Sequence, residues 1–260
     1  MLLAIDVGNT NIVLGVFEGR ELRHSWRLAT YRERTSDELG ILVSELFAHA
    51  ALPRDRITGI ILSSVVPPLT RPAVEMCRRY FSRDALVVDP AGNAGMVVLY
   101  EPKTDVGADR VVNAVAAYEL YGKQKRAPII VVDFGTATTF DAITERGEYL
   151  GGVICPGVQI SADALFQRAA RLPRVDVQKP ATVIGRTTVT SMQSGLFFGY
   201  VGMVDGIVAR MRKELGPARA FCIGTGGLAE IIAAETDTIE TVNPDLTLLG
   251  LKMIWERNRN

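Results

Sequence analysis

The sequence predicts an α/β protein made of two similar domains, and two observations lead to this fold class. Strand-length apolar segments alternate with segments whose apolar residues recur at helical spacing. The pattern LLAIDVGNTNIVLGVF at the start of the chain returns after residue 128 as IIVVDFGTATTFDAI. Asp133 and Gly135 follow Asp6 and Gly8 by 127 residues, which is the period of a domain rather than of a solenoid repeat. We therefore expect two α/β domains that meet near residues 115–128.

The first half begins with three predicted strands, over residues 2–7, 12–18 and 21–28, the last two joined by a hairpin at Gly19. TSDE at residues 35–38 is a capping box, and the apolar residues after it recur at helical spacing. The other predicted elements of this half are a buried strand in ITGIILSSV, a helix over PPLTRPAVEMCRRYF with Pro68 in its first turn, and a helix over GADRVVNAVAAYELYG that closes at Gly122.

The second half continues after its repeated strands with a glycine turn and a helix in ICPGVQISADALFQRAARL. A long helix follows and ends at Gly216. AFCIGTGGLAEII predicts a strand, a glycine turn and a helix, and NPDLTLLGLKMIWERN predicts a final helix with Pro244 in its first turn. All elements of an α/β domain are therefore present in this half as well.

The long helix carries a stripe of four glycines, Gly195, Gly199, Gly202 and Gly206, whose spacing places them on one face. Each glycine costs roughly 1 kcal/mol relative to alanine inside a helix. Four together indicate the close approach of another backbone. A neighbouring helix of the same chain and a second subunit explain the stripe equally well.

The composition argues against several classes of protein. Lys and Arg number 29, as do Asp and Glu, so nothing favours a nucleic-acid or anionic-membrane partner. The N-terminus lacks a signal-peptide pattern, and the apolar runs are too short to span a membrane, so we expect a cytoplasmic protein. Cys77, Cys155 and Cys222 are far apart, which fits a reducing compartment and excludes a cysteine zinc site. With only His24 and His49 present, a general base is expected among the carboxylates.

The turn DVGNT combines backbone N–H groups with the side chains of Asn9 and Thr10 directly after a strand. Such turns bind phosphate oxygens, and Asp6 at the strand end can hold Mg²⁺ against them, usually through water. A single turn of this kind could also be an ordinary type I′ hairpin. The second D-x-G turn and GTGG at residues 224–227 strengthen the nucleotide-binding interpretation. The Walker and Rossmann glycine motifs are absent, which excludes both of those nucleotide-binding classes.

This set of turns resembles the actin/hexokinase/acetate-kinase-like superfamily. The resemblance implies two duplicated ribonuclease-H-like (actin-like ATPase) domains with a central cleft that clamps ATP. The N-terminal domain, residues 1–118, would contribute the first phosphate turn. The C-terminal domain, residues 119–260, would contribute the second phosphate turn, an adenosine turn at GTGG and the glycine-faced helix.

The segment DVGADRVVNAVAAYE, residues 105–119, narrows this resemblance. Asp109 and Arg110 would lie at the start of a helix, and Gly107 and Ala108 would allow close backbone access to a substrate. A first-turn helix acid that adds under roughly 1 kcal/mol of stability is the alternative for Asp109. Together with DVGNTN, DFGTATTFDAI, GGVICPGVQIS and SMQSGLFFGYVGMVDGI, the segment resembles the type III pantothenate kinase family over essentially the whole chain, with the motifs in the family's order.

The resemblance implies a transferase that phosphorylates pantothenate to 4′-phosphopantothenate with ATP, in the first step of coenzyme A biosynthesis. It further implies a homodimer with the substrate pocket at the subunit interface, which favours the second explanation of the glycine stripe. Asp109 would be the general base. Asp133 would bind K⁺ or NH₄⁺, and Asp6 would bind Mg²⁺ through water. The implied ATP contacts are Asp6, Val7, Gly8, Asn9, Thr10, Asn11, Ile12, Val13, Thr136 and Gly226, and the implied pantothenate contacts are Tyr100, Gly107, Ala108, Asp109, Arg110 and Thr188.

Structural alternatives stay open for two of these residues. Tyr100 could be an aromatic residue that closes a loop, and Thr188 could be a helix N-cap. For the whole chain, the alternatives are a non-catalytic regulatory or scaffold protein on the same fold and another small-molecule kinase of the superfamily. Because Asp6, Asp109 and Asp133 are all present, the sequence favours the enzyme.

Overall fold

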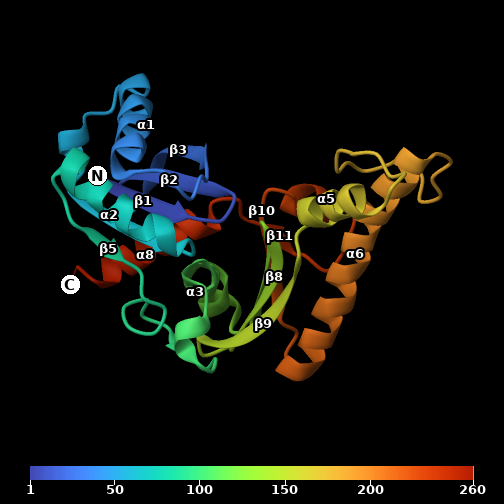
Figure 1. Ribbon diagram of the computed structural model, residues 1–260. Coiled ribbons are helices and arrows are strands. Elements are labelled where there is room, and N and C mark those ends of the chain that lie inside the picture. The colour runs from blue at the N-terminus through green and yellow to red at the C-terminus, as the bar shows by residue number, and fades with distance from the viewer. Residues whose placement is uncertain (260) are drawn as a thin grey trace. The chain divides into compact units, whose positions relative to one another are not determined.

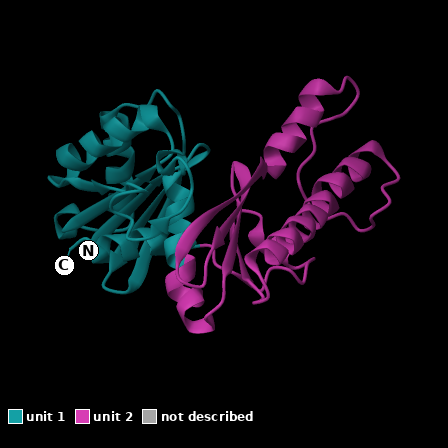
Figure 2. Cartoon of the chain, turned by 90° about the horizontal axis from the view of Figure 1, so that it is seen from below, with its two compact units in different colours: residues 1–116, 245–260 teal, residues 117–244 magenta. Residues whose placement is uncertain are grey.

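The computed structural model describes residues 1–259, which form two compact α/β units (Figure 2). Unit 1 contains Met1–Ala116 and the C-terminal residues from Asp245 onward, and unit 2 contains Ala117–Pro244. Each unit has a sheet of its own, so the predicted class, a duplicated α/β fold, is confirmed.

Unit 1 is built on a five-stranded sheet in the order β3-β2-β1-β4-β5 (Figure 1). The strands of this sheet are β1 (Leu2–Val7), β2 (Asn11–Glu18), β3 (Glu21–Ala29), β4 (Gly59–Ser64) and β5 (Ala85–Val87), and the short β6 (Val97–Val98) of unit 1 lies outside it. Its helices are α1 (Ser36–His49), α2 (Pro67–Phe81), α3 (Ala108–Ala117) and α8 (Leu246–Arg257), with 3₁₀ turns η1 (Arg54–Arg56) and η2 (Lys103–Asp105).

The alternation of side chains along β1 explains how this sheet is covered on both faces. Leu3, Ile5 and Val7 are buried against apolar residues of α1 and α2. On the other face, Gly15 of β2 lies against Leu248 of α8. The capping box of α1 is present as expected, because Thr35 accepts from the backbone N–H of Glu38 and the Glu38 side chain accepts from that of Thr35.

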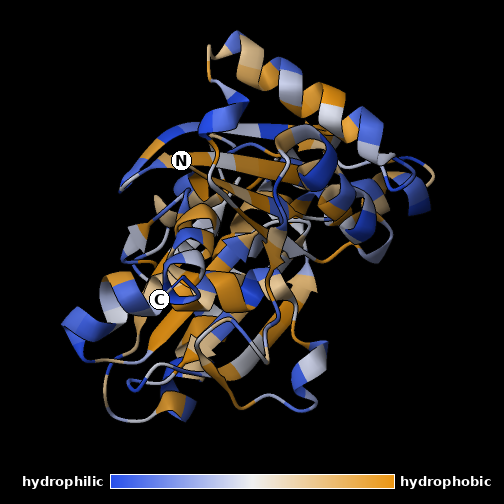
Figure 3. Ribbon diagram, turned by 90° about the vertical axis from the view of Figure 1, so that its left-hand side faces the viewer, coloured by the Kyte–Doolittle hydropathy of each residue, from blue (hydrophilic) through white to orange (hydrophobic). Residues whose placement is uncertain are grey.

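Unit 2 repeats this design on strands in the order β11-β10-β7-β8-β9. The strands are β7 (Ile129–Phe134), β8 (Ala137–Ile143), β9 (Glu148–Pro156), β10 (Phe221–Gly226) and β11 (Thr241–Val242). The helices are α4 (Lys123–Lys125), α5 (Val158–Arg168), α6 (Thr188–Leu215) and α7 (Ala229–Ala233), with one π-helical turn, η3 (Tyr118–Gly122). Apolar residues of β7 and β8 pack against α5, α6 and α7, and Figure 3 shows many strand residues in the orange of apolar side chains.

Strand pairing establishes which positions of the two units correspond. In unit 1, β1 pairs with β2 antiparallel and with β4 parallel, and in unit 2, β7 pairs in the same way with β8 and β10. Asp6 of β1 and Asp133 of β7 therefore occupy the same place in two copies of one topological unit. This is the arrangement that the internal repeat predicts.

Three helix positions differ from those that the sequence predicts. The backbone stays helical past Gly122 to Lys125, and Arg126 ends it with φ 50°, because Gly122 lies inside the helix against the Tyr118 ring. Asp245 is the N-cap of α8, so Pro244 precedes the helix rather than entering its first turn. The division at residue 118 placed α8 with the second half, whereas in the structure it packs in unit 1.

Candidate active site

The turn predicted to be the first phosphate turn connects β1 to β2 through Gly8, Asn9 and Thr10. The Gly8 N–H donates to the carbonyl oxygen of Asn11 at 3.0 Å, which closes the turn. Asp6 precedes the turn at the end of β1 and is half-buried, and Asn9 and Thr10 are exposed. The expected ATP contacts from Asp6 to Val13 are thus brought together on one strand–turn–strand corner.

The GADR segment lies against the carboxyl end of the same sheet. Val65, just after β4, donates its N–H to the Val7 carbonyl oxygen at 3.0 Å. A Cβ on Gly107 would stand 3.6 Å from a methyl group of Val65, so Gly107 borders the residue that follows β4. Ala108–Ala117 form α3, and Asp109 lies in its first turn, as the sequence predicts.

Asp109 is held in place by its own turn. Its Oδ1 accepts the backbone N–H of Arg110 at 2.8 Å and lies 2.6 Å from where a Cβ on Gly107 would stand. Any larger residue at position 107 would displace the carboxylate, which explains the glycine. Burial raises the pKa of the Asp109 carboxyl above the ordinary value of 3.8, against the opposing effects of the Arg110 N–H and the Arg110 charge. A carboxylate with a raised pKa accepts a proton more readily near neutral pH.

The second phosphate turn, between β7 and β8, is one residue shorter than the first. Gly135 donates its N–H to the carbonyl oxygen of Ala137 at 3.1 Å. Asp133 at the end of β7 is half-buried, and Thr136 is exposed in the turn. Gly226 has φ 88°, and a Cβ there would come within 2.6 Å of Asp133 Oδ1. The backbone of Gly226 therefore packs directly against the Asp133 carboxylate and the Phe134 backbone, where no side chain would fit.

A buried hydroxyl accompanies each of these aspartates on the neighbouring parallel strand. Ser63 of β4 is paired with Asp6, and Thr225 of β10 is paired with Asp133. Ser63 is 0% exposed and Thr225 is 2% exposed. Neither residue was predicted from the sequence, although SS in ITGIILSSV and GTGG come at corresponding strand ends and could have indicated them.

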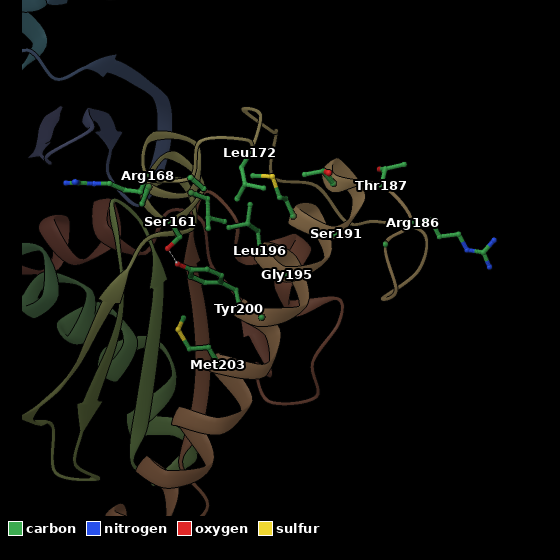
Figure 4. Close-up of a pocket in the computed structure, with 17 residues that line it drawn as sticks. Ser161, Arg168, Leu172, Arg186, Thr187, Ser191, Gly195, Leu196, Tyr200 and Met203 are labelled. Carbon is green, nitrogen blue, oxygen red and sulfur yellow. Dashed lines mark hydrogen bonds between the residues drawn. The ribbon is translucent and has the colours of Figure 1, made fainter.

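Thr188 lies in a groove of about 1290 Å³ between α5 and the N-terminal half of α6 (Figure 4). Thr187, not Thr188, is the N-cap of α6, because its side chain accepts from the Thr190 N–H. The groove floor is tied to β9, since Tyr200 donates to the Pro156 carbonyl oxygen at 2.7 Å and contacts Ser161 Oγ at the same distance. Tyr100 is half-buried in the loop between β6 and η2.

The sequence of the chain is similar to that of one family of known proteins. The sequence model described as type III pantothenate kinase matches residues 2–210. A type III pantothenate kinase from Myxococcus xanthus (strain DK1622) is 55% identical over 99% of this chain and 99% of its own length. The chain belongs to the type III pantothenate kinase family.

Two solved structures support the fold of this family member. One, described as a Baf family transcriptional activator from Campylobacter jejuni, has a TM-score of 0.61 at 19% identity over 99% of both chains. The other, described as a 2-dehydro-3-deoxygalactonokinase from Sinorhizobium meliloti, has a TM-score of 0.59 at 12% identity over 98% of this chain and 96% of that one. At these identities they show the fold alone. The expected family and enzyme class, a pantothenate kinase, are confirmed by the family match and the curated relative.

The glycine stripe of this pantothenate kinase family member faces outward. No atom of residues 1–259 beyond the helix's own backbone lies within 4 Å of a Cβ built on Gly195, Gly199 or Gly202. A neighbouring helix of the same chain therefore does not explain these three glycines. None of the helices in residues 1–259 combines the length and the apolar character needed to cross a membrane.

Proposed function

We propose that Asp109 is the general base of the reaction of the family to which the chain belongs. This family phosphorylates pantothenate with ATP in coenzyme A biosynthesis. The observation that carries this assignment is the carboxylate at the start of α3, fixed by the Arg110 N–H and raised in pKa by burial. Asp109 accepts the proton of the primary hydroxyl of pantothenate while that oxygen attacks the γ-phosphorus, and ADP leaves. Gly107, Ala108, Arg110, Tyr100 and Thr188 bind the pantothenate.

The ATP contacts in this proposal are the residues from Asp6 to Val13, Thr136 and Gly226. Phosphoryl transfer depends chiefly on in-line positioning and on neutralising charge, which turn N–H groups and cations provide. Within residues 1–259 no three His, Cys, Asp or Glu side chains gather as metal ligands. A magnesium ion at Asp6 fits this single carboxylate when water and phosphate oxygens complete its shell. Bound there, Mg²⁺ supplies positive charge to the phosphates.

Asp133 holds a monovalent cation, K⁺ or NH₄⁺. The family resemblance is the reason for this assignment, and the half-buried carboxylate of Asp133 at the end of β7 is the group that would bind the cation. We further propose a homodimer formed through the outward glycine face of α6, which permits close backbone approach. The cysteines Cys77, Cys155 and Cys222 are all free, which is consistent with a cytoplasmic location.

Replacing Asp109 by Asn tests the assignment of the base. A positioned general base contributes about 10²–10⁴-fold, so Asp109→Asn should reduce pantothenate-dependent ADP release at least ~100-fold with the fold intact. Asp37→Asn is the matched control, because Asp37 is also a first-turn helix acid, in α1, and should keep its turnover. Wild-type turnover in Asp109→Asn would refute the assignment of Asp109 as the general base. ADP release by the wild type that does not depend on pantothenate would refute the assignment of pantothenate as the substrate.

Salt exchange tests the cation at Asp133. Turnover with saturating ATP and pantothenate should fall when K⁺ is replaced by Na⁺ at constant ionic strength. Asp133→Asn should reduce both the activity and its dependence on the cation. Equal rates of the wild type in the two salts would exclude the cation role of Asp133.

A further inference from the structure

Thr30 directly follows β3 and contacts the first phosphate turn at two points. Its hydroxyl donates to the Gly8 carbonyl oxygen at 2.7 Å, and its backbone N–H donates to the Thr10 carbonyl oxygen at 2.9 Å. The side chain is half-buried, and it approaches the turn from 20 residues further along the chain. The carbonyl groups of Gly8 and Thr10 are therefore both directed at Thr30.

Because the peptide bond is planar, a carbonyl group that is held in place also fixes the direction of the N–H group of the next residue. In a trans peptide, the C=O of one residue and the N–H of the next point in opposite directions. With the Gly8 carbonyl held toward Thr30, the N–H of Asn9 points away from it. The N–H of Asn11 is directed in the same way by the Thr10 carbonyl. The contacts of Thr30 thus direct the N–H groups of Asn9 and Asn11 away from Thr30.

The other copy of the unit shows that a threonine is not required by the topology. Strand register places Gly157, directly after β9, at the position of Thr30. A Cβ on Gly157 would overlap the Thr136 carbonyl oxygen and come within 2.8 Å of the Gly135 carbonyl oxygen. The second turn is therefore supported by backbone packing. The hydroxyl is a feature of the first turn alone.

We propose that Thr30 is a positioning residue for ATP, whose hydroxyl fixes the Gly8–Asn9 peptide so that the Asn9 N–H points at a phosphate oxygen. This proposal rests on the proposed function of residues 6–13 as the ATP turn. Without the hydroxyl, the Gly8 carbonyl loses its donor and the peptide is free to rotate, carrying the Asn9 N–H with it. Binding of ATP then weakens, whereas binding of pantothenate does not.

Three variants test this role by steady-state kinetics. Thr30→Val keeps the shape and removes the donor, and Thr30→Ser restores it. Thr58→Val is the matched control, because Thr58 donates its N–H and hydroxyl to the Met1 carbonyl oxygen, at 2.9 and 3.3 Å, at the opposite end of β1. The loss of one hydrogen bond predicts a roughly 3- to 10-fold higher KM for ATP in Thr30→Val. Thr30→Ser and Thr58→Val should stay within about 2-fold of the wild type, and KM for pantothenate should not change in any variant.

A binding measurement separates this proposal from the proposed function. Calorimetric titration of each variant with a non-hydrolysable ATP analogue and Mg²⁺, without pantothenate, should show the same order of affinities. A lower Tm in Thr30→Val with wild-type KM and Kd for nucleotide would show a purely structural role and overturn the proposal. If the wild type bound the analogue but did not phosphorylate pantothenate, the proposed function would fail while the analogue affinities still decided the role of Thr30. If the wild type bound no analogue, both would be refuted. Thr30→Ala provides the same test should Thr30→Val not fold.

Discussion

The turn after β1 and the turn after β7 occupy the same place in two copies of one topological unit, yet they are supported by different groups. In the first, the Thr30 hydroxyl binds the Gly8 carbonyl oxygen. In the second, the backbone of Gly157 packs directly on the carbonyl groups of Thr136 and Gly135. The first turn also contains one residue more than the second.

The difference shows which parts of the duplicated unit are constrained. Both copies keep the strand pairing, the aspartate at the strand end and a buried hydroxyl beside it. What differs is the residue that supports the turn, because the longer turn leaves room for a side chain and the shorter turn leaves none. Substitutions should therefore be tolerated differently at corresponding positions.

The largest expected effect is that of Gly157→Ala. The new methyl group would collide with two backbone carbonyl groups that cannot rotate away like a side chain. Overpacking of this kind costs about 1–3 kcal/mol, and here it would also shift the second turn. We expect a lower Tm in calorimetry together with reduced turnover. The corresponding variant Thr30→Ala should lose only about 1 kcal/mol. Equal losses in the two variants would contradict the comparison.

An intermediate effect concerns pH, and it belongs to unit 1 alone because Asp109 lies there. The proposed general base acts when ionised, so the raised pKa of Asp109 predicts that kcat/KM falls on the acid side at a pH above the ordinary 3.8. The folded state favours the protonated carboxyl, so the wild type loses stability as pH rises from 3.8 through the raised pKa. Asp109→Asn should therefore raise Tm at neutral pH, because the amide carries no charge that burial would penalise.

The control for this effect is the same pair of proteins at low pH. Below pH 3.8 the carboxyl is protonated in both the folded and the unfolded state, so the two Tm values should converge. A difference in Tm that did not change with pH would show that burial of the charge is not its cause.

The smallest expected effect is a difference in the stability cost of an alanine substitution at Gly8 and at Gly135, the first glycines of the two turns. A Cβ on Gly8 would stand 3.0 Å from the Asn11 carbonyl oxygen, whereas a Cβ on Gly135 would stand 3.5 Å from that of Ala137. Gly8→Ala should therefore cost about 1 kcal/mol, and Gly135→Ala should stay within about 0.5 kcal/mol of the wild type. Thermal unfolding of the two single variants measures the difference, and the reverse order would contradict it.

Sequence patterns predicted the strands, the duplication and the helix that carries Asp109, because periodicity, capping residues and the D-x-G repeat are local signals. They did not predict that helical backbone passes Gly122, because packing against Tyr118 outweighs the preference of glycine for helix ends. Thr30 could have been found, since it aligns with Gly157 at the same 127-residue offset as the two aspartates. Its hydrogen bonds could not be predicted, because they join Thr30 to Gly8 and Thr10, which lie 22 and 20 positions earlier in the chain.

The helix α8 packs in unit 1 although it follows all of unit 2 in the chain, which determines the order in which the parts of unit 1 are synthesised. Trp255 packs on Gly59 of β4, Leu248 on Gly15 of β2, and Gly250 on the backbone of Val112. Because unit 2 precedes α8 in the chain, the ribosome synthesises every residue of unit 2 before it synthesises the helix that completes unit 1. The sheet of unit 1 keeps the face that α8 covers exposed until α8 has been synthesised, so unit 1 is completed only after the whole of unit 2 has been made.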